Sequence, residues 1–427
     1  MFIQKLLAEA RQKPLEYFIG FCVFLVAAFG AVVKDVASSV FLIFIVISFF
    51  YVKQWPQTWR CLGQIEKLFL TGLLLYLASG FLSYINVADD YEYIKHMGRY
   101  LRFALIVPVY LFLVRSKFEL TRFFILGIVV SGPVYLFFAL LTIYINQGPP
   151  GQGYYHHILF GDTAMLNSAL MMVFLLTRKF SFSIRLLVVI SMFCALYASV
   201  LSTARGAWVA APVLIIMLAG YAIKTRTINI KSISVIIAIL LVIVASTPVR
   251  DIVATRFIEA VNEVKMFNSD EKADTSVGGR LALWDVAIRV WEENPVLGTG
   301  PGDYNDDLVD YQSKGLYPGV FVHDSVHNIY LQALVSTGIV GLLVFILALI
   351  VFPLIFLQTA KPGGGQLERL SGLVLIVSVL IFGLTESWTL RSPFIAIFVI
   401  YLVVTFSQAG KGLRDAKQPL VTGQVSG

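Results

Sequence analysis

The sequence predicts an all-α polytopic membrane protein. Of its 427 residues, 58% are hydrophobic and only 14% are charged, and apolar runs recur along the chain. Crossing the hydrocarbon core of a bilayer takes roughly 20 apolar residues in a helix. A soluble core cannot absorb so much apolar surface, so these observations predict about twelve transmembrane helices.

The expected membrane helices follow one another closely, except before the tenth. They lie near 14–33, 36–52, 68–86, 101–114, 123–145, 158–177, 186–204, 206–223, 231–247, 329–356, 370–387 and 392–407. The first run lacks a small-residue cleavage site and another run follows it at once, so we expect a retained helix. We divide the chain into helices one to nine (1–247), a large external loop (248–328), helices ten to twelve (329–407) and a tail (408–427).

Charge predicts the orientation of these helices. Lys and Arg near short loops stay on the cytoplasmic side of a membrane, and they gather in every second connection, near 5–13, 53–67, 115–122, 178–185, 224–231, 361–369 and 411–417. We therefore expect both termini in the cytoplasm and the loop 248–328 outside. The net charge of +7 is mostly this topology signal, so we expect membrane lipids and no nucleic acid as partners.

The external segments show helical patterns of their own. Near 250–266 apolar residues recur at helical spacing, and a second helix is indicated by Leu281, Trp284, Ile288 and Trp291, with Arg280 at its start and Asn294-Pro295 at its end. Asp89 to Leu101 forms a third expected helix, rich in tyrosine. We expect these helices to lie at the membrane interface.

Arg205 interrupts a long uncharged stretch, 186–223, at the external end of an expected helical hairpin. Inserting a charge into the membrane costs about 2.5–3.5 kcal/mol at central positions, so such residues are functional candidates. A guanidinium group is a planar fork of donors that suits a diphosphate. The alternatives are an interfacial arginine that reaches water, or a partner for a structural carboxylate such as Glu386.

Arg280 follows Gly278 and Gly279 and precedes an amphipathic helix. Flexible backbone and a helix N-terminus would together present amides and a cation to an anion. The alternative is a solvated arginine in a loop.

His327 stands where the polar loop meets the tenth apolar helix. Its imidazole has an ordinary pKa of about 6.5, so the neutral form can accept a proton from a hydroxyl; a satisfied interfacial histidine is the alternative. Asn328 would orient a ligand or cap the following helix. Gly338 and Gly341, three residues apart, would let a neighbouring helix approach closely.

Two further patterns carry weaker signals. His323, Asp324 and His327, with His156 and His157, have residue types that bind metals, but the glutamate of an HExxH motif is absent, and we expect no metal. The string LGTGPGDY at 297–304 resembles a dinucleotide-binding fingerprint, yet no strand precedes it and Pro301 interrupts it. We expect a turn-forming loop packed against the membrane face.

Three segments together carry a family resemblance. They are STARGAW at 202–208, GGRLALWDVAIRVWEENPVLGTGPGDY at 278–304, and His327-Asn328 followed by nine residues, glycine, two residues and glycine. Over about the second half of the chain, which contains these segments, the sequence resembles the bacterial O-antigen ligases. The related O-antigen polymerases share the region in looser form.

The resemblance implies a C-type glycosyltransferase-like fold and an inverting membrane glycosyltransferase of lipopolysaccharide biosynthesis. Its site would face the periplasm of the bacterial inner membrane and use no cofactor or metal. Arg205 and Arg280 would bind the diphosphate of undecaprenyl-diphosphate-linked O-antigen, and His327 would act on a hydroxyl of the lipid A-core acceptor. Glu386 and Arg391 resemble an acidic residue and arginine pair of some ligases. Asn328, His323, Gly338 and Gly341 are further substrate-binding candidates.

Two other functions remain open at this stage. An O-antigen polymerase would use the same donor with a second lipid-linked glycan as its acceptor. A polysaccharide or lipid transporter would also have many spans and intramembrane arginines. Against transport, the two halves show no evident inverted repeat, and the polar candidates gather at one face rather than at the midplane.

Overall fold

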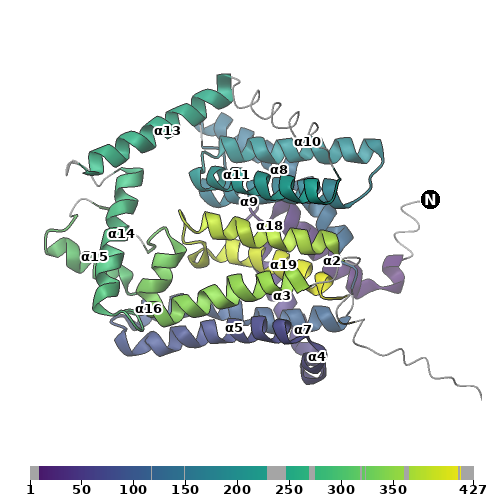
Figure 1. Ribbon diagram of the computed structural model, residues 1–427, viewed down its shortest axis with the longest axis horizontal. Coiled ribbons are helices and arrows are strands. Elements are labelled where there is room, and N and C mark those ends of the chain that lie inside the picture. The colour runs from purple at the N-terminus through teal and green to yellow at the C-terminus, as the bar shows by residue number, and fades with distance from the viewer. Residues whose placement is uncertain are drawn as a thin grey trace, which may run out of the picture.

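The computed structural model describes residues 9–116, 118–148, 150–227, 247–268, 275–317, 320–322, 324–359, 365–411 and 414. Every regular element in these ranges is a helix and none is a strand, which confirms the all-α fold class. Most of the long helices run side by side as one bundle, and α13, α14 and α15 lie across one end of it (Figure 1).

The helices follow the order predicted from the apolar runs. They are α2 Pro14–Phe29, α3 Val36–Phe50, α4 Trp55–Cys61, α5 Gln64–Leu82, α6 Asp90–Ala104, α7 Ile106–Ser116, α8 Thr121–Asn146, α9 His157–Thr177, α10 Phe182–Leu201, α11 Arg205–Lys224, α13 Thr247–Asn268, α14 Ser276–Glu293, α15 Tyr304–Ser313, α16 Ile329–Ile346, α17 Phe352–Thr359, α18 Gln366–Phe382 and α19 Ser392–Ala409.

Within the described ranges, 8 helices are long and apolar enough to cross a membrane, or 9 if the bent pair Val36–Phe50 and Val52–Cys61 is one span. The predicted span at 231–247 lies outside the described residues, except for Thr247. The predicted span at 101–114 and the predicted interfacial helix at 89–101 form one longer apolar unit, Asp90–Ser116. The exact number of spans therefore stays a prediction.

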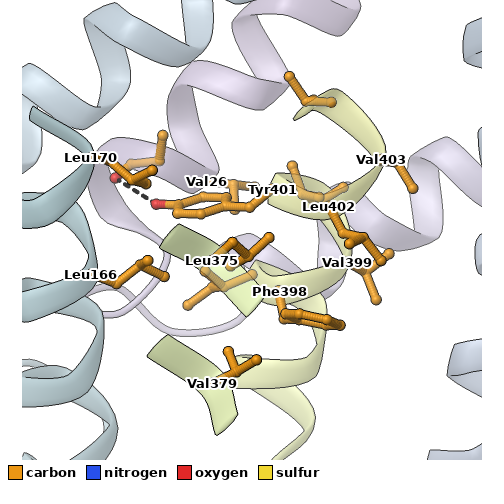
Figure 2. Packing of buried hydrophobic residues seen from close by; sticks show 14 of the residues in the cluster. Val26, Leu166, Leu170, Leu375, Val379, Phe398, Val399, Tyr401, Leu402 and Val403 are labelled. Atoms are coloured by element: carbon orange, nitrogen blue, oxygen red, sulfur yellow. Dashed lines mark hydrogen bonds between the residues drawn. The ribbon is translucent and has the colours of Figure 1, made fainter. Parts of the chain in front are cut away.

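The centre of the bundle is formed by α9 and α19, which are its most buried candidate spans. Figure 2 shows Tyr401 of α19 surrounded by side chains of several helices, among them Leu166, Leu170 and Leu375. The buried hydroxyl of Tyr401 donates a hydrogen bond to Oδ1 of Asn167 at 3.1 Å. A polar group away from water needs such a partner, so this contact fixes α19 against α9.

Gly161 brings the start of α9 against the turn between α10 and α11. A Cβ atom at Gly161 would lie 2.1 Å from Oγ of Ser202 and 2.6 Å from Cβ of Ala204. Small residues permit this kind of close helix packing in membranes. The packing places the N-terminal ends of α9 and α11 next to each other.

The helices α14 and α15, which lie across one end of the bundle (Figure 1), share a small core. Buried residues of α14, among them Leu283 and Val286, pack with Tyr304 and Leu308 of α15 and with Val335 of α16. The predicted helix near 250–266 corresponds to α13, and the predicted helix around Leu281 corresponds to α14, which ends at Glu293 with Asn294 as its C-cap. This core holds α14 across the end of the bundle.

Gly338 interrupts α16 with a left-handed backbone, φ 62°. A Cβ atom there would lie 2.2 Å from the carbonyl oxygen of Val296, so a loop after α14, rather than a neighbouring helix as predicted, makes the close approach. Gly341 faces the Thr337 side chain of its own helix. The LGTGPGDY segment is a loop with positive φ at three glycines, and Nδ2 of Asn86 donates to the carbonyl of Gly298 at 2.7 Å.

Replacing Gly338 with alanine should destabilise the protein. The substitution adds backbone strain of about 1–3 kcal/mol and a clash with backbone atoms of Val296 and Leu297 that cannot move as a side chain can. Differential scanning fluorimetry in detergent should show a lower apparent Tm. Gly98→Ala is the matched control, because nothing lies within 4 Å of its Cβ position and alanine favours the helix; equal Tm values for both variants would contradict this account.

Candidate functional site

A cavity of about 490 Å³ lies at the end of the bundle that α13 and α14 cover. It brings together Arg205, Arg280 and His327, which are far apart in the chain. The lining residues come from the start of α9, the α10–α11 turn, α13, α14 and the segments before α16 and α19. They are Pro150, His156, His157, Ile158, Thr203, Ala204, Arg205, Gly206, Arg256, Thr275, Ser276, Gly279, Arg280, Leu283, Val320, Phe321, His327 and Thr385.

Arg205 is the first residue of α11, directly after the turn that packs on Gly161. Its Nη2 atom lies 3.3 Å from Oε2 of Glu259 and 3.8 Å from Oε1 of Glu263, both on α13. Its Nη1 atom is buried and makes no hydrogen bond to the described residues. Arg205 therefore pairs with α13 and not with Glu386, and one of its donors still lacks an acceptor.

Arg280 lies at the start of the second turn of α14, since the helix begins at Ser276 with Thr275 as its N-cap. Gly278 and Gly279 are therefore helical. The prediction that they form flexible backbone before the helix is wrong. No carboxylate of the described residues lies within ion-pair distance of Arg280. Burial lowers the pKa of its guanidinium from the usual value; the nearby carboxylate of Glu386 raises it and Arg205 lowers it further. Arg280 thus presents a cation to the cavity without an anion of its own.

His327 is held in a left-handed backbone conformation, φ 54°, which is uncommon for a residue other than glycine. Both neighbours of His327 are anchored. Nε1 of Trp284 on α14 donates to the carbonyl of Val326 at 3.0 Å, and the amide of Asn328 donates to Oγ of Ser387 at 3.1 Å. These contacts explain why the imidazole keeps its place between α14 and the α18–α19 connection.

Glu386, which is not among the described lining residues of the cavity, contacts the imidazole of His327 at Nδ1. Its Oε2 atom lies 3.1 Å from Nδ1 of His327, and its Oε1 atom accepts a hydrogen bond from Nε of Arg391 at 3.1 Å. Burial alone would raise the pKa of Glu386, but the hydrogen bond and charge of His327 and the charge of Arg391 lower it to about 2. When the imidazole is neutral, an ionised carboxylate beside Nδ1 favours the tautomer with its proton on Nδ1 and its lone pair on Nε2.

The predicted pair of Glu386 and Arg391 is thus a direct contact. Arg391 also reaches Asp324, with Nη1 3.5 Å from Oδ1, and Arg99 of α6 lies 3.7 Å from the other oxygen of Asp324. Opposite charges therefore alternate away from His327. This network orients the carboxylate that orients the imidazole.

Asn328 caps α16, since its Oδ1 atom accepts from the amides of Tyr330 and Leu331 at 3.0 and 3.2 Å. These contacts confirm the capping role, and a role of Asn328 in orienting a ligand stays a prediction. Gly338 and Gly341 lie farther along α16 and do not line the cavity. His323 lies outside the described residues.

His156 and His157 line the same cavity from the start of α9. Nδ1 of His157 lies 2.8 Å from the carbonyl oxygen of Ser202, which ties α9 to the α10–α11 turn. Burial lowers the pKa of His156. Within the described ranges, no group of three or more histidine, cysteine, aspartate or glutamate residues is arranged to hold a metal ion.

Sequence reasoning missed the contribution of α13. Arg256 lines the cavity, where its Nη2 donates to Oγ1 of Thr203 at 3.4 Å, and its Nη1 pairs with Glu259 at 3.0 Å. Arg256, Glu259 and Glu263 are spaced by three and four residues, which places them on one face of a helix. That spacing was visible, but nothing in it says which other residues the face meets.

The described residues that line the cavity carry positive and no negative side chains. Arg205, Arg256 and Arg280 line it with three histidines, and no aspartate or glutamate is among the described lining residues. The N-terminal end of α11 adds amides that have no partner within the helix and a favourable dipole for anions. A phosphate-containing ligand fits this arrangement of cations and amides.

Glu386→Gln should reduce stability in a pH-dependent way. Because the pKa of Glu386 falls from a usual 4.5 to about 2 in the folded protein, its ionised form stabilises the fold fully above pH 4.5. This stabilisation is lost as the pH falls through about 2. Apparent Tm values at pH 7 and at successively lower pH should show a gap between wild type and variant that closes with acid. Glu292→Gln, an exposed control on α14, should match wild type; a gap independent of pH would argue against the assigned ion pairs.

Comparison with known proteins supports the family resemblance. Residues 190–346 match the family model described as O-Antigen ligase, and this range contains Arg205, Arg280 and His327. A protein of Haemophilus influenzae, described only as an uncharacterized protein, is 25% identical over 336 residues, which are 76% of this chain and 81% of that protein. The match over residues 190–346 confirms the family resemblance inferred from the sequence.

Proposed function

We propose that this chain, a member of the O-antigen ligase family through residues 190–346, is a membrane glycosyltransferase. It transfers O-antigen polysaccharide from undecaprenyl diphosphate to a sugar hydroxyl of lipid A-core. The observation that carries the proposal is the meeting of Arg205, Arg280 and His327 in one cavity whose described lining includes no carboxylate. Cations suit the diphosphate of the donor, and a histidine suits the hydroxyl of the acceptor.

The transfer needs little covalent chemistry from the protein. The acceptor oxygen attacks the anomeric carbon from the face opposite the diphosphate, and a new C–O bond forms there. The bond from the anomeric carbon to the phosphate oxygen breaks, and its electron pair leaves with the lipid diphosphate. Attack from the opposite face inverts the anomeric centre without a glycosyl-enzyme intermediate.

Arg205 and Arg280 stabilise the departing diphosphate. Negative charge grows on the bridging oxygen as the bond breaks, and fixed donors in a site shielded from water stabilise such charge strongly. Nη1 of Arg205, which makes no hydrogen bond to the described residues, and the guanidinium of Arg280, which forms no ion pair with them, supply these donors. The arginines take the role that a metal ion has in many phosphoryl and glycosyl transfers, so we propose a metal-independent reaction.

His327 accepts the proton of the acceptor hydroxyl at Nε2. Glu386, 3.1 Å from Nδ1, favours the tautomer of a neutral imidazole that carries its proton on Nδ1, and Nε2 can then accept the proton of the hydroxyl. The ionised carboxylate also stabilises the imidazolium that forms. Arg391 and Asp324 keep Glu386 in place. His327 is thus the general base, or the group that orients the hydroxyl.

We place the reaction at the periplasmic face of the inner membrane, with both termini in the cytoplasm. The proposal is supported by the cations of every second loop and by the position of the cavity under α13 and α14, at the end opposite those loops. A lipid-linked sugar needs a site where the membrane surface meets water. This position fits that need better than a transport site, which is expected near the midplane.

An O-antigen polymerase would use the same diphosphate site and the same base, so the site alone does not separate the two reactions. The acceptor does. Purified protein incubated with donor and lipid A-core should attach glycan to the core if it is a ligase. It would instead lengthen the lipid-linked chain if it is a polymerase.

Arg205→Ala and Arg280→Ala should each lower transfer in that assay by about 10²–10³-fold, because each removes a donor to developing charge. Arg205→Lys and Arg280→Lys should rescue little, since a point charge cannot reproduce the planar fork. Arg289→Ala is the matched control on α14, where Arg289 is exposed and pairs with Asp285 at 2.9 Å. Equal loss in the control, or full activity with lysine, would refute the assigned role.

His327→Ala should lower transfer by about 10²–10⁴-fold, the usual contribution of a positioned base, while donor binding stays near wild type. His327→Asn is the more informative variant, because asparagine tolerates the left-handed backbone at φ 54° but is not a base. Transfer is measured by gel shift of lipid A-core, and donor binding by co-purification of labelled lipid. Glycan-capped core at wild-type yield in either variant would rule out the base.

A further inference from the structure

Arg205 contacts two carboxylates of its own chain at the cavity. Glu259 and Glu263 of α13 lie 3.3 and 3.8 Å from its Nη2 atom. Glu263 is the more buried of the two carboxylates, at 14% exposure against 41%. Both come from the external helix that covers the cavity, and neither belongs to the bundle in which Arg205 is anchored.

Glu263 makes a second contact, with the N-terminal end of α14. Its Oε2 atom accepts a hydrogen bond from the amide of Val277 at 2.6 Å, in the first turn of the helix that carries Arg280. One carboxylate therefore joins a guanidinium and a helix N-terminus. A phosphate group is bound by the same two kinds of donor.

Glu259 also contacts two groups at the cavity, and both are arginines. Its Oε2 atom contacts both Arg205 and Arg256, at 3.3 and 3.0 Å. The two glutamates thus bind cations at the edge of a cavity whose described lining has no carboxylate. A partly buried arginine without an anion is costly, and these contacts reduce that cost while no ligand is bound.

We propose that Glu259 and Glu263 occupy the place of the donor diphosphate at Arg205 and at the N-terminal end of α14, and that they are exchanged for it when donor binds. This inference rests on the proposed function. The two carboxylates set the affinity of the site for diphosphate, because binding must displace them from Arg205 and from the amide of Val277.

The same exchange assists product release. Transfer converts a diphosphate joined to both lipid and sugar into one joined to lipid alone, which exposes a further ionisable oxygen. A more negative product would bind cations more tightly and leave slowly. Competition from Glu259 and Glu263 for the same donors counters this effect.

A purely structural role for the glutamates makes the opposite prediction. If they only fix α13 and α14, replacing them should loosen the cavity and weaken ligand binding. If they occupy the ligand's place, replacing them should strengthen binding. The direction of the change therefore separates the two roles.

The test uses the full chain in detergent, with inorganic pyrophosphate as the probe and isothermal titration calorimetry as the measurement. Glu263→Gln keeps an oxygen that can accept from Val277 but removes the charge, and Glu259→Gln does the same for the second site. Each should lower the Kd by about fivefold or more, within the usual range of coupling between competing sites. Asp251→Asn is the control, since Asp251 is exposed on α13 and pairs only with Arg250 in the described structure.

The outcomes separate this inference from the proposed function. Tighter binding in the glutamine variants that is abolished by Arg280→Ala supports both. Binding that needs Arg280 but is unchanged or weaker in both glutamine variants overturns the exchange and leaves the diphosphate site standing. If neither wild type nor the glutamine variants bind pyrophosphate, the proposed function fails and the exchange fails with it.

Hydrogen–deuterium exchange gives a second readout that does not depend on the variants. Pyrophosphate should increase the exchange of amides in the part of α13 around Glu259 and Glu263, because their contacts with Arg205 and Val277 are lost. Amides of α14 should exchange no faster, since the ligand replaces Glu263 at the helix N-terminus. Slower exchange in α13 on ligand binding would overturn the proposal.

Discussion

The candidate site depends on how the positive charges of its arginines are compensated at one end of the bundle. Arg205 and Arg280 lie in a partly buried cavity whose described lining has no carboxylate, and a cation removed from water needs an anion nearby. Arg205 finds it in Glu259 and Glu263 on an external helix, whereas Arg280 has no carboxylate within ion-pair distance among the described residues. A site built in this way is incomplete without an anionic ligand, and the proposed reaction supplies one.

The scaffold converts this imbalance into a defined geometry. Close packing at Gly161 sets the start of α11 and hence Arg205. The core between α14, α15 and α16 sets Arg280. The residues before and after His327 are held by hydrogen bonds to Trp284 and Ser387. Glu386 orients the imidazole ring through the contact of its carboxylate with Nδ1 at 3.1 Å. Each reactive group is therefore held by a different part of the fold, and the cavity is where these parts meet.

The sequence predicted the elements better than their contacts. Apolar periodicity identified most of the long apolar helices, because burial in lipid imposes one composition on any span. It identified α13 and α14 of the loop 248–328 but missed α15. It also singled out Arg205, Arg280 and His327, since charged or titratable groups beside apolar runs are rare. It missed the pairing of Arg205 with α13 and misjudged the neighbour of Gly338, because both depend on the packing of segments distant in the chain. Local spacing shows which face of a helix a residue occupies, but not what that face meets.

The central claim is that Arg205 and Arg280 together bind a lipid-linked diphosphate. An experimental structure of the full chain in a lipid nanodisc with undecaprenyl diphosphate tests it most directly. The account predicts diphosphate density between the two guanidinium groups, near Nε2 of His327, with Glu259 and Glu263 withdrawn from Arg205. Diphosphate bound elsewhere on the protein, with Arg205 still paired with Glu259 and Glu263, would contradict it.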